Sequence, residues 1–141
     1  MKLVFLGVFL FSINLVFSQN TNLIHSSAPD TLVVAKVDLG ACVDEKDWVV
    51  HLTNELEPAI KKAAKKGLKA GTYIVRVKFL VERDGSIKYV QALNDPGYNL
   101  AKAAVKGVQT GPRWSPGIQN GRKVRSFHTQ PICFVIQEGN G

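Results

Sequence analysis

Histidine, cysteine and serine side chains are the usual carriers of metal binding and nucleophilic catalysis, and this chain offers few of them in useful spacings. His25, His51 and His128 are far apart, and no two have the spacing of metal ligands. The serines lack the surroundings of a nucleophile elbow, and no glycine-rich phosphate loop follows a predicted strand. Asp84-Gly85-Ser86 lacks the further ligands of a calcium loop. The pattern predicts no enzyme, cofactor or metal site; a small hydrolase or an inhibitor would need a cleft or exposed loop that the sequence does not indicate.

The two cysteines favour a disulfide bond. Cys42 follows a predicted strand and Cys133 lies within the last one, and an even cysteine count in an exported chain favours a disulfide. Such a bridge would tie the N-terminal segment to the sheet and contribute about 4–5 kcal/mol in the chain-entropy model. Two buried thiols that never meet are the alternative.

The N-terminus predicts export. Lys2 precedes an apolar run from Leu3 to Phe17, and Val16-Phe17-Ser18 provides small or aliphatic cleavage positions, which is typical of a secretory signal peptide cut after Ser18. A retained anchor is the alternative, but the run is shorter than the ~20 residues of a spanning helix. We expect a signal peptide over 1–18, a flexible leader over 19–30, a single domain over 31–141, and a periplasmic location.

The net charge of +7 is carried largely by two groups of basic residues. The first group, of lysines, has no aromatic partner of the kind expected on a nucleic-acid surface, and export also argues against such a partner, so we expect no nucleic-acid partner. A solvated helix face is one interpretation, and attraction to peptidoglycan or anionic headgroups is the other. The groups are Lys61, Lys62, Lys65, Lys66 and Lys69, and Arg122, Lys123 and Arg125.

The first half of the exported chain predicts a strand followed by helices. Apolar residues alternate from Thr31 to Leu39, which favours a strand. Helical spacing then begins at Asp44, a suitable N-cap. Proline is unfavourable inside a helix, so we expect one helix over Glu45–Leu56 and a second over Pro58–Lys66. Gly67 should end the second helix in the left-handed conformation.

The second half predicts a small antiparallel sheet with a packing helix. Apolar residues alternate over 73–81, and Asp84-Gly85 is a turn that joins antiparallel strands. The returning strand, Ile87–Leu93, breaks strict alternation and should contain a bulge. A helix is expected over Tyr98–Val108, and a last strand begins at Asn120-Gly121. The predicted fold is α+β: about three antiparallel strands with helices on one face, plus an N-terminal strand and helix.

The last strand provides the candidate binding site. Pro131 donates no ladder hydrogen bond, so this strand should be an edge or carry a bulge. An edge strand can accept an extended peptide as one more strand, and the same edge would permit strand exchange between two copies. Basic residues near its start favour an acidic or polar peptide; protection from aggregation is the alternative role for them. The expected partner-binding residues are Lys123, Val124, Arg125, Ser126 and Phe127.

A set of short motifs, none specific alone, follows a recognisable order from Leu52 to Ile136. They include Leu56 and Pro58, Gly67-Leu68, Gly71, Asp84-Gly85-Ser86-Ile87, Leu100, Ala103-Ala104, Pro112, Trp114, Pro116-Gly117, Asn120-Gly121, Pro131 and Phe134. Together they resemble the C-terminal domain of TonB, the periplasmic part of a Gram-negative energy transducer that grips outer-membrane transporters. The resemblance implies a non-enzymatic module that binds an extended peptide of an outer-membrane transporter or another envelope protein by strand addition.

The chain also departs from that family. Glu57 stands where relatives often have tyrosine before the proline, and the interval from Gly67 to Gly71 is a residue longer than usual. The transducer has a retained membrane helix with a coupling histidine and a proline-rich spacer, neither of which this sequence contains. A freestanding periplasmic binding module is therefore expected, and a structural envelope protein that adheres through its lysine-rich helix is the alternative.

Overall fold

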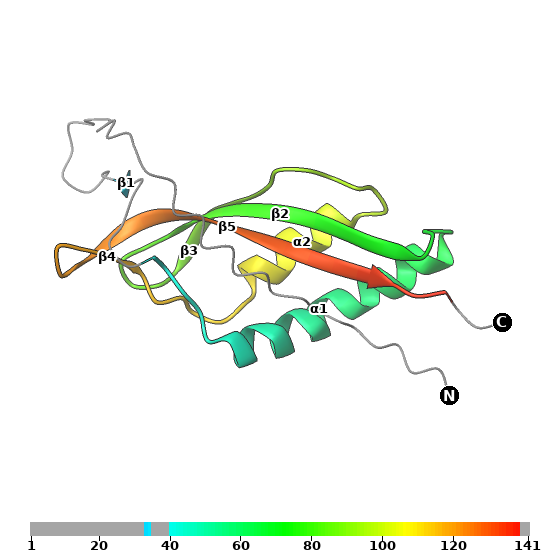
Figure 1. Ribbon diagram of the computed structural model, residues 1–141, viewed down its shortest axis with the longest axis horizontal. Helices are drawn as coiled ribbons and strands as arrows, with labels where there is room; N and C mark the ends of the chain where they lie inside the picture. Colours follow the sequence, from blue (N-terminus) through cyan, green and yellow to red (C-terminus); the bar gives the residue numbers. More distant parts are fainter. Residues whose placement is uncertain (1–32, 35–39, 139–141) are drawn as a thin grey trace.

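The computed structural model describes residues 33–34 and 40–138, drawn in colour in Figure 1. The predicted signal peptide (1–18) and leader (19–30) lie outside the described residues. Of the strand expected over Thr31–Leu39, only β1, Val33–Val34, is described.

Three long strands form the sheet, and β2 lies between the other two. β2 (Gly71–Val81) pairs antiparallel with β3 (Ile87–Ala92) and with β5 (Arg122–Ile136). The short strand β4 (Gly117–Gln119) pairs with the beginning of β5, and β1 adds to β5 in parallel. The order of the main sheet is therefore β1-β5-β2-β3.

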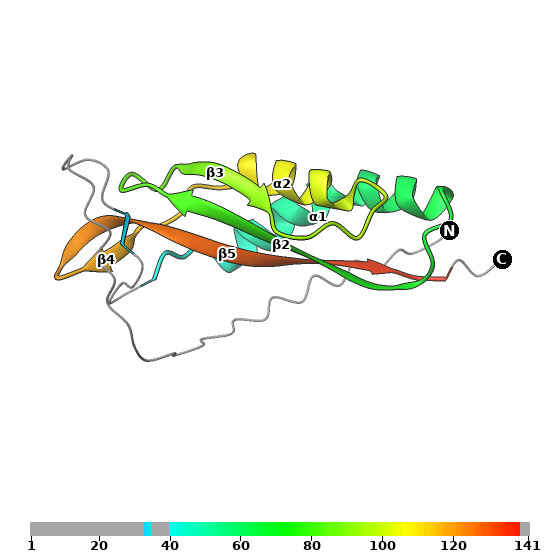
Figure 2. The same cartoon turned by 90° about the horizontal axis from the view of Figure 1, so that it is seen from above.

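Both helices lie on one face of this sheet, as Figure 2 shows. They are α1, Glu45–Lys65, and α2, Leu100–Gln109. Alternate β2 side chains point towards them, because successive strand residues face opposite sides; Val75, Val77 and Phe79 are fully buried. The predicted α+β class, with helices on one face, is confirmed. No helix in the described part of the chain is both long enough and apolar enough to cross a bilayer.

The helix α1 differs from the prediction at Pro58. The two helices expected over Glu45–Leu56 and Pro58–Lys66 are one continuous helix with Pro58 inside it. Proline removes one backbone donor, but a single buried stripe continues across it, with Leu56 before it and Ile60 and Ala63 after it. Burial of this stripe against the sheet keeps the two segments in one helix, which local propensity could not predict.

The predicted signals at helix ends and turns are confirmed. Asp44 caps α1 by accepting a hydrogen bond from the Asp47 backbone N–H at 3.0 Å. Gly67 follows the helix with φ +89°, and the N–H of Leu68 bonds back to the Ala63 carbonyl, which satisfies the last turn. In β3 the register shifts opposite Lys78 and Leu80, which places the expected bulge near Tyr89 (φ 53°).

The prediction missed the strand β4. Asn120 and Gly121 have φ of 49° and 70°, as a type I′ turn requires, and they join β4 to β5. Asn120-Gly121 was interpreted as the beginning of one strand, although it is typical of a hairpin with strands on both sides. The partner strand has three residues, which is too short for an alternating pattern to predict it.

Candidate partner-binding edge

The five expected binding residues lie together at the beginning of β5, but the structure already pairs most of them. Lys123 and Val124 pair with Ile118 and Gly117 of β4. Arg125 and Ser126 pair with Val33 and Val34 of β1. Phe127 pairs only with Leu80 of β2. Within the described residues, the part of β5 that is paired only with β2 therefore begins at Phe127, where the predicted site ends.

Hydrogen bonds around Arg76 identify the side of β5 that is available. The Arg76 N–H donates to Asn94 Oδ1 at 2.8 Å and its carbonyl accepts from the Leu93 N–H at 2.7 Å, so both groups point towards β3. Arg76 is opposite Pro131, and in such a non-hydrogen-bonded pair the backbone groups of both residues point away from each other. Pro131 therefore loses no bond to β2, which agrees with the prediction of an edge strand.

The same alternation defines what we call the outer edge: the side of β5 away from β2. Since backbone direction alternates along a strand, Phe127, Thr129, Cys133 and Val135 direct their N–H and C=O groups to this side, as Pro131 directs its C=O. Beyond Ser126, no strand within the described residues pairs with the outer edge.

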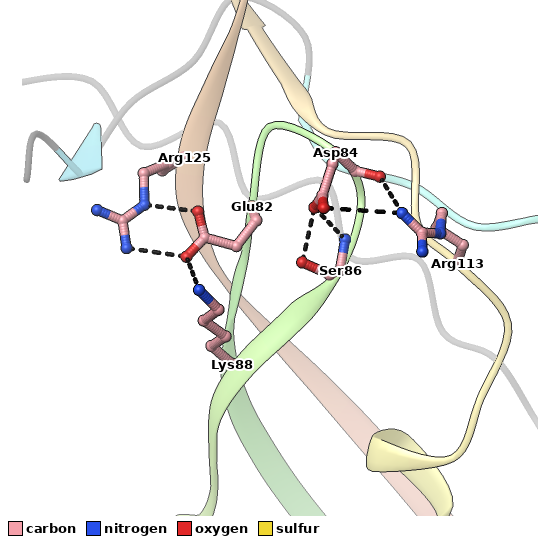
Figure 3. Close-up of polar contacts among 6 residues, drawn as sticks. All are labelled: Glu82, Asp84, Ser86, Lys88, Arg113 and Arg125. Carbon is pink, nitrogen blue, oxygen red and sulfur yellow. Dashed lines mark hydrogen bonds and ion pairs between the residues drawn. The ribbon is translucent and has the colours of Figure 1, made fainter. Parts of the chain in front are cut away.

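Arg125, one of the expected partner-binding residues, forms an ion pair within the protein. It was expected to face a peptide, but its Nε and Nη2 donate to the two Glu82 carboxylate oxygens at 2.7 and 2.9 Å (Figure 3). The two side chains are only 15% and 14% exposed, and Lys88 Nζ lies 3.5 Å from the same carboxylate. The Arg125 hydrogen bonds hold the pKa of Glu82 below its ordinary value. This pair fixes the start of β5 to the end of β2, in a shallow hollow of about 290 Å³.

The turn between β2 and β3 is fixed to the loop before β4. Asp84 Oδ1 accepts hydrogen bonds from the backbone N–H and hydroxyl of Ser86, which lower the Asp84 pKa. Arg113 donates to the Asp84 carbonyl at 3.0 Å (Figure 3). The Gly85 carbonyl accepts from the Trp114 N–H at 3.0 Å. The acidic side chain of this turn therefore organises the loop, and the described residues contain no group of three potential metal ligands.

An aromatic cluster lies beneath this loop. Trp114 is 4% exposed, and its ring contacts Trp48, Phe79 and His128 with centroids 4.8–5.5 Å apart. Burial lowers the pKa of His128, opposed by its hydrogen bond with Gln130. His128 is half-buried, with its ring against those of Phe79 and Trp114.

The face of the sheet opposite the helices carries exposed apolar side chains on β2 and β5. Ile74 and Phe127 are 44% and 49% exposed. Lys78 Nζ lies 4.7 Å from the centre of the Phe127 ring, so a positive charge is held over that ring. This surface combines apolar contact with positive charge beside the unpaired backbone.

The expected disulfide between Cys42 and Cys133 is not formed, and both thiols are free. Cys42 pairs with Ser115, in the loop joined to Gly85, whereas Cys133 pairs with Ile74 near the other end of β2. Strands rise about 3.3 Å per residue, so the sites are separated by far more than the ~7 Å between Cα atoms that a disulfide spans. Burial raises the pKa of the Cys133 thiol.

Comparison with known proteins agrees with this architecture. Residues 61–136 match the family described as the Gram-negative bacterial TonB protein C-terminal. Neither a curated protein nor a solved structure matches the chain significantly. The matched range covers the end of α1 and all of β2 to β5, so it includes the whole outer edge of β5 but not β1. This chain therefore belongs to the family of TonB C-terminal domains.

Proposed function

We propose that this protein binds an extended segment of an outer-membrane transporter or another envelope protein, which adds as a strand to the outer edge of β5. The family is a non-enzymatic, protein-interacting domain of the Gram-negative periplasm, and we infer that this chain likewise acts by binding. The carrying observation is that no strand among the described residues pairs with the outward backbone groups of β5 from Phe127 to Val135. Such a run attracts an extended chain because each N–H and C=O gains a partner.

Side chains beside the edge favour particular sequences. Phe127 and Ile74 offer apolar contact, and Lys78 and Arg76 add positive charge on the same face. A segment that alternates apolar and acidic residues would suit this surface, since alternate residues of an added strand face the same side. Backbone pairing would supply much of the affinity and these side chains the preference.

The test removes one outward donor without removing a bond to β2. Thr129→Pro eliminates an N–H that faces the outer edge, while Thr129→Val keeps that N–H and suits a strand. Envelope extract is passed over immobilised wild-type protein and both variants, after circular dichroism has established that each variant is folded. We expect Thr129→Val to capture the same partner as wild type and Thr129→Pro to lose it. Equal capture by folded Thr129→Pro would contradict strand addition at this edge.

A second candidate function rests on the lysines of α1. Lys61, Lys62, Lys65 and Lys66 are exposed in and just after its last turns, and they could attach the protein to peptidoglycan or anionic headgroups. Attraction between exposed charges is screened at high ionic strength, whereas strand addition persists. Capture that disappears in 0.5 M salt and is insensitive to Thr129→Pro would favour the lysine surface.

A further inference from the structure

The chain provides a strand for its own binding edge. Val33 and Val34 pair in parallel with Arg125 and Ser126 of β5, and β2 pairs with Ser126 from the other side. β1 therefore occupies the outer edge, immediately before the run from Phe127 onward, with which no other described strand pairs on that side. It lies outside the part of the chain that matches the family, residues 61–136, so the family match does not account for it.

A backbone clamp holds this segment close to the edge. The Cys42 N–H donates to the Ser115 carbonyl at 3.0 Å, and the Ser115 N–H donates to the Cys42 carbonyl at 2.7 Å. Ser115 lies just before β4, which pairs with the first residues of β5. Only residues 35–41 separate β1 from the clamp, so a detached β1 would remain beside the edge. A short tether of this kind gives an effective concentration in the millimolar range.

The pairing is of a kind that can open. β1 is bonded on one side only, and parallel pairing is slightly less stable per residue than antiparallel pairing, so a strand added at the edge of a sheet belongs to the less stable part of a fold. Because β1 pairs weakly but is present at high local concentration, it can cover the edge when no partner is present. A partner strand that forms more hydrogen bonds can then replace it.

We propose that β1 (Val33–Val34) is an internal ligand of the outer edge, which an external partner strand must displace. This inference rests on the proposed function, because it assigns regulation to the same edge. The internal strand also indicates the orientation of the external one: a partner that replaces it would run parallel to β5. The segment protects the outward backbone groups of Arg125 in the free protein and lowers the apparent affinity for weak or non-specific strands.

The first measurement uses the chain without its expected signal peptide and without any substitution. Nuclear Overhauser effects should connect backbone protons of Val33 and Val34 with those of Arg125 and Ser126. Their absence would overturn the proposal. A mixture of isotope-labelled and unlabelled protein determines whether the contact lies within one chain; cross-peaks between chains would overturn the internal assignment in favour of strand exchange between copies.

The second measurement disrupts the segment. In the double variant Val33→Pro, Val34→Pro, the segment loses both N–H groups. Amide exchange should become faster in peptides spanning Lys123 to Phe127 and stay unchanged in Val75–Val81, with Ser26→Pro as a matched control outside β1. Unchanged exchange at Lys123 to Phe127 would overturn the proposal. If exchange accelerates throughout the sheet, the double variant is destabilised as a whole. The nuclear Overhauser effects of the unmodified chain then decide whether β1 pairs with β5.

The third measurement supplies the strand in trans. A synthetic peptide with the sequence of residues 30–40 is titrated at micromolar concentration onto wild type and the double-proline variant. We expect the variant to bind on the order of tenfold or more tightly than wild type, because the tethered copy competes at high effective concentration. The same peptide with both valines replaced by proline should not bind. Equal binding to both proteins, or binding to neither, would overturn the inference, whereas loss of partner capture in Thr129→Pro tests the proposed function separately.

Discussion

The two sides of β5 differ in how completely they are paired. On the inner side, β2 pairs in unbroken register from Ser126 to Ile136, opposite Val81 to Gly71. On the outer edge, only the two residues of β1 pair within the described chain. One strand therefore closes the core through one side and offers backbone groups through the other. A binding module built in this way can change its outer partner without opening its core.

The two ends of β5 also differ. The beginning lies beside the Arg125–Glu82 pair, the Gly85–Trp114 contact and the aromatic cluster. The remaining length carries partly exposed residues such as Phe127 on the open face of the sheet. Substitutions near the beginning should therefore affect stability, and substitutions along the outer edge should affect binding.

The largest effect is expected at Trp114. Trp114→Ala removes a buried ring that contacts Trp48, Phe79 and His128, and loss of a buried tryptophan costs about 3–5 kcal/mol. Phe127→Ala removes an aromatic ring that is 49% exposed, so it should cost less than about 1 kcal/mol. Urea unfolding of both variants provides the measurement. Equal destabilisation would show that the two regions do not differ as described.

Gly85 should be next, because both its conformation and its surroundings exclude a side chain. Its φ is +81°, and an added Cβ would lie 1.9 Å from the Trp114 carbonyl oxygen. Gly85→Ala should cost about 2–4 kcal/mol, from backbone strain and displacement of the loop that bonds to Trp114. Gly121 also has positive φ (+70°), but open space around it, so Gly121→Ala should cost about 1–2 kcal/mol from strain alone. Similar melting temperatures for the two variants would contradict the close packing at Gly85.

A smaller effect is expected at Arg125. Arg125→Ala leaves the partly buried Glu82 with Lys88 as a charged partner at 3.5 Å. Loss of hydrogen bonds to a charged group costs about 1.5–3 kcal/mol. The neighbouring exposed residue gives the control: Lys123→Ala should change stability by about 0.5 kcal/mol or less. If Arg125→Ala weakens partner capture but leaves the unfolding midpoint unchanged, the original interpretation of Arg125 as a peptide contact would be correct.

These contrasts indicate what the sequence could predict. Features set by neighbouring residues were predicted correctly: the Asp44 cap, the Gly67 helix end, the Asp84-Gly85 hairpin and the bulge in β3. Each depends on a few adjacent residues whose backbone preferences are strong. The alternating pattern of β2 was sufficient to predict its buried face and therefore the helices that cover it.

Features set by distant residues were missed. α1 continues through Pro58 because the sheet buries residues on both sides of it. The Arg125–Glu82 pair joins two strands, and charge alone does not identify which residue pairs with which. The parallel pairing of β1 depends on where the chain returns after the Cys42–Ser115 clamp. The candidate edge was predicted correctly as a strand, but its available length was not, because coverage by β1 and β4 is a property of the folded chain.

The smallest expected effect is a pH dependence of stability from His128. Burial against Phe79 and Trp114 lowers its pKa in the folded protein, whereas an unfolded histidine titrates near 6.5. Below that pH the unfolded chain binds the proton more readily than the folded chain, so stability is full above about pH 6.5 and decreases as the pH falls towards the folded pKa. The Glu82 and Asp84 pKa values are also lowered, and protonation of these carboxylates decreases the stability only at more acidic pH. Melting temperatures between pH 7.5 and 5.5 should therefore fall for wild type and for His51→Gln, while His128→Phe should largely remove the decrease. If the melting temperature of His128→Phe decreased as much as that of wild type, the pH dependence would come from another group in the chain.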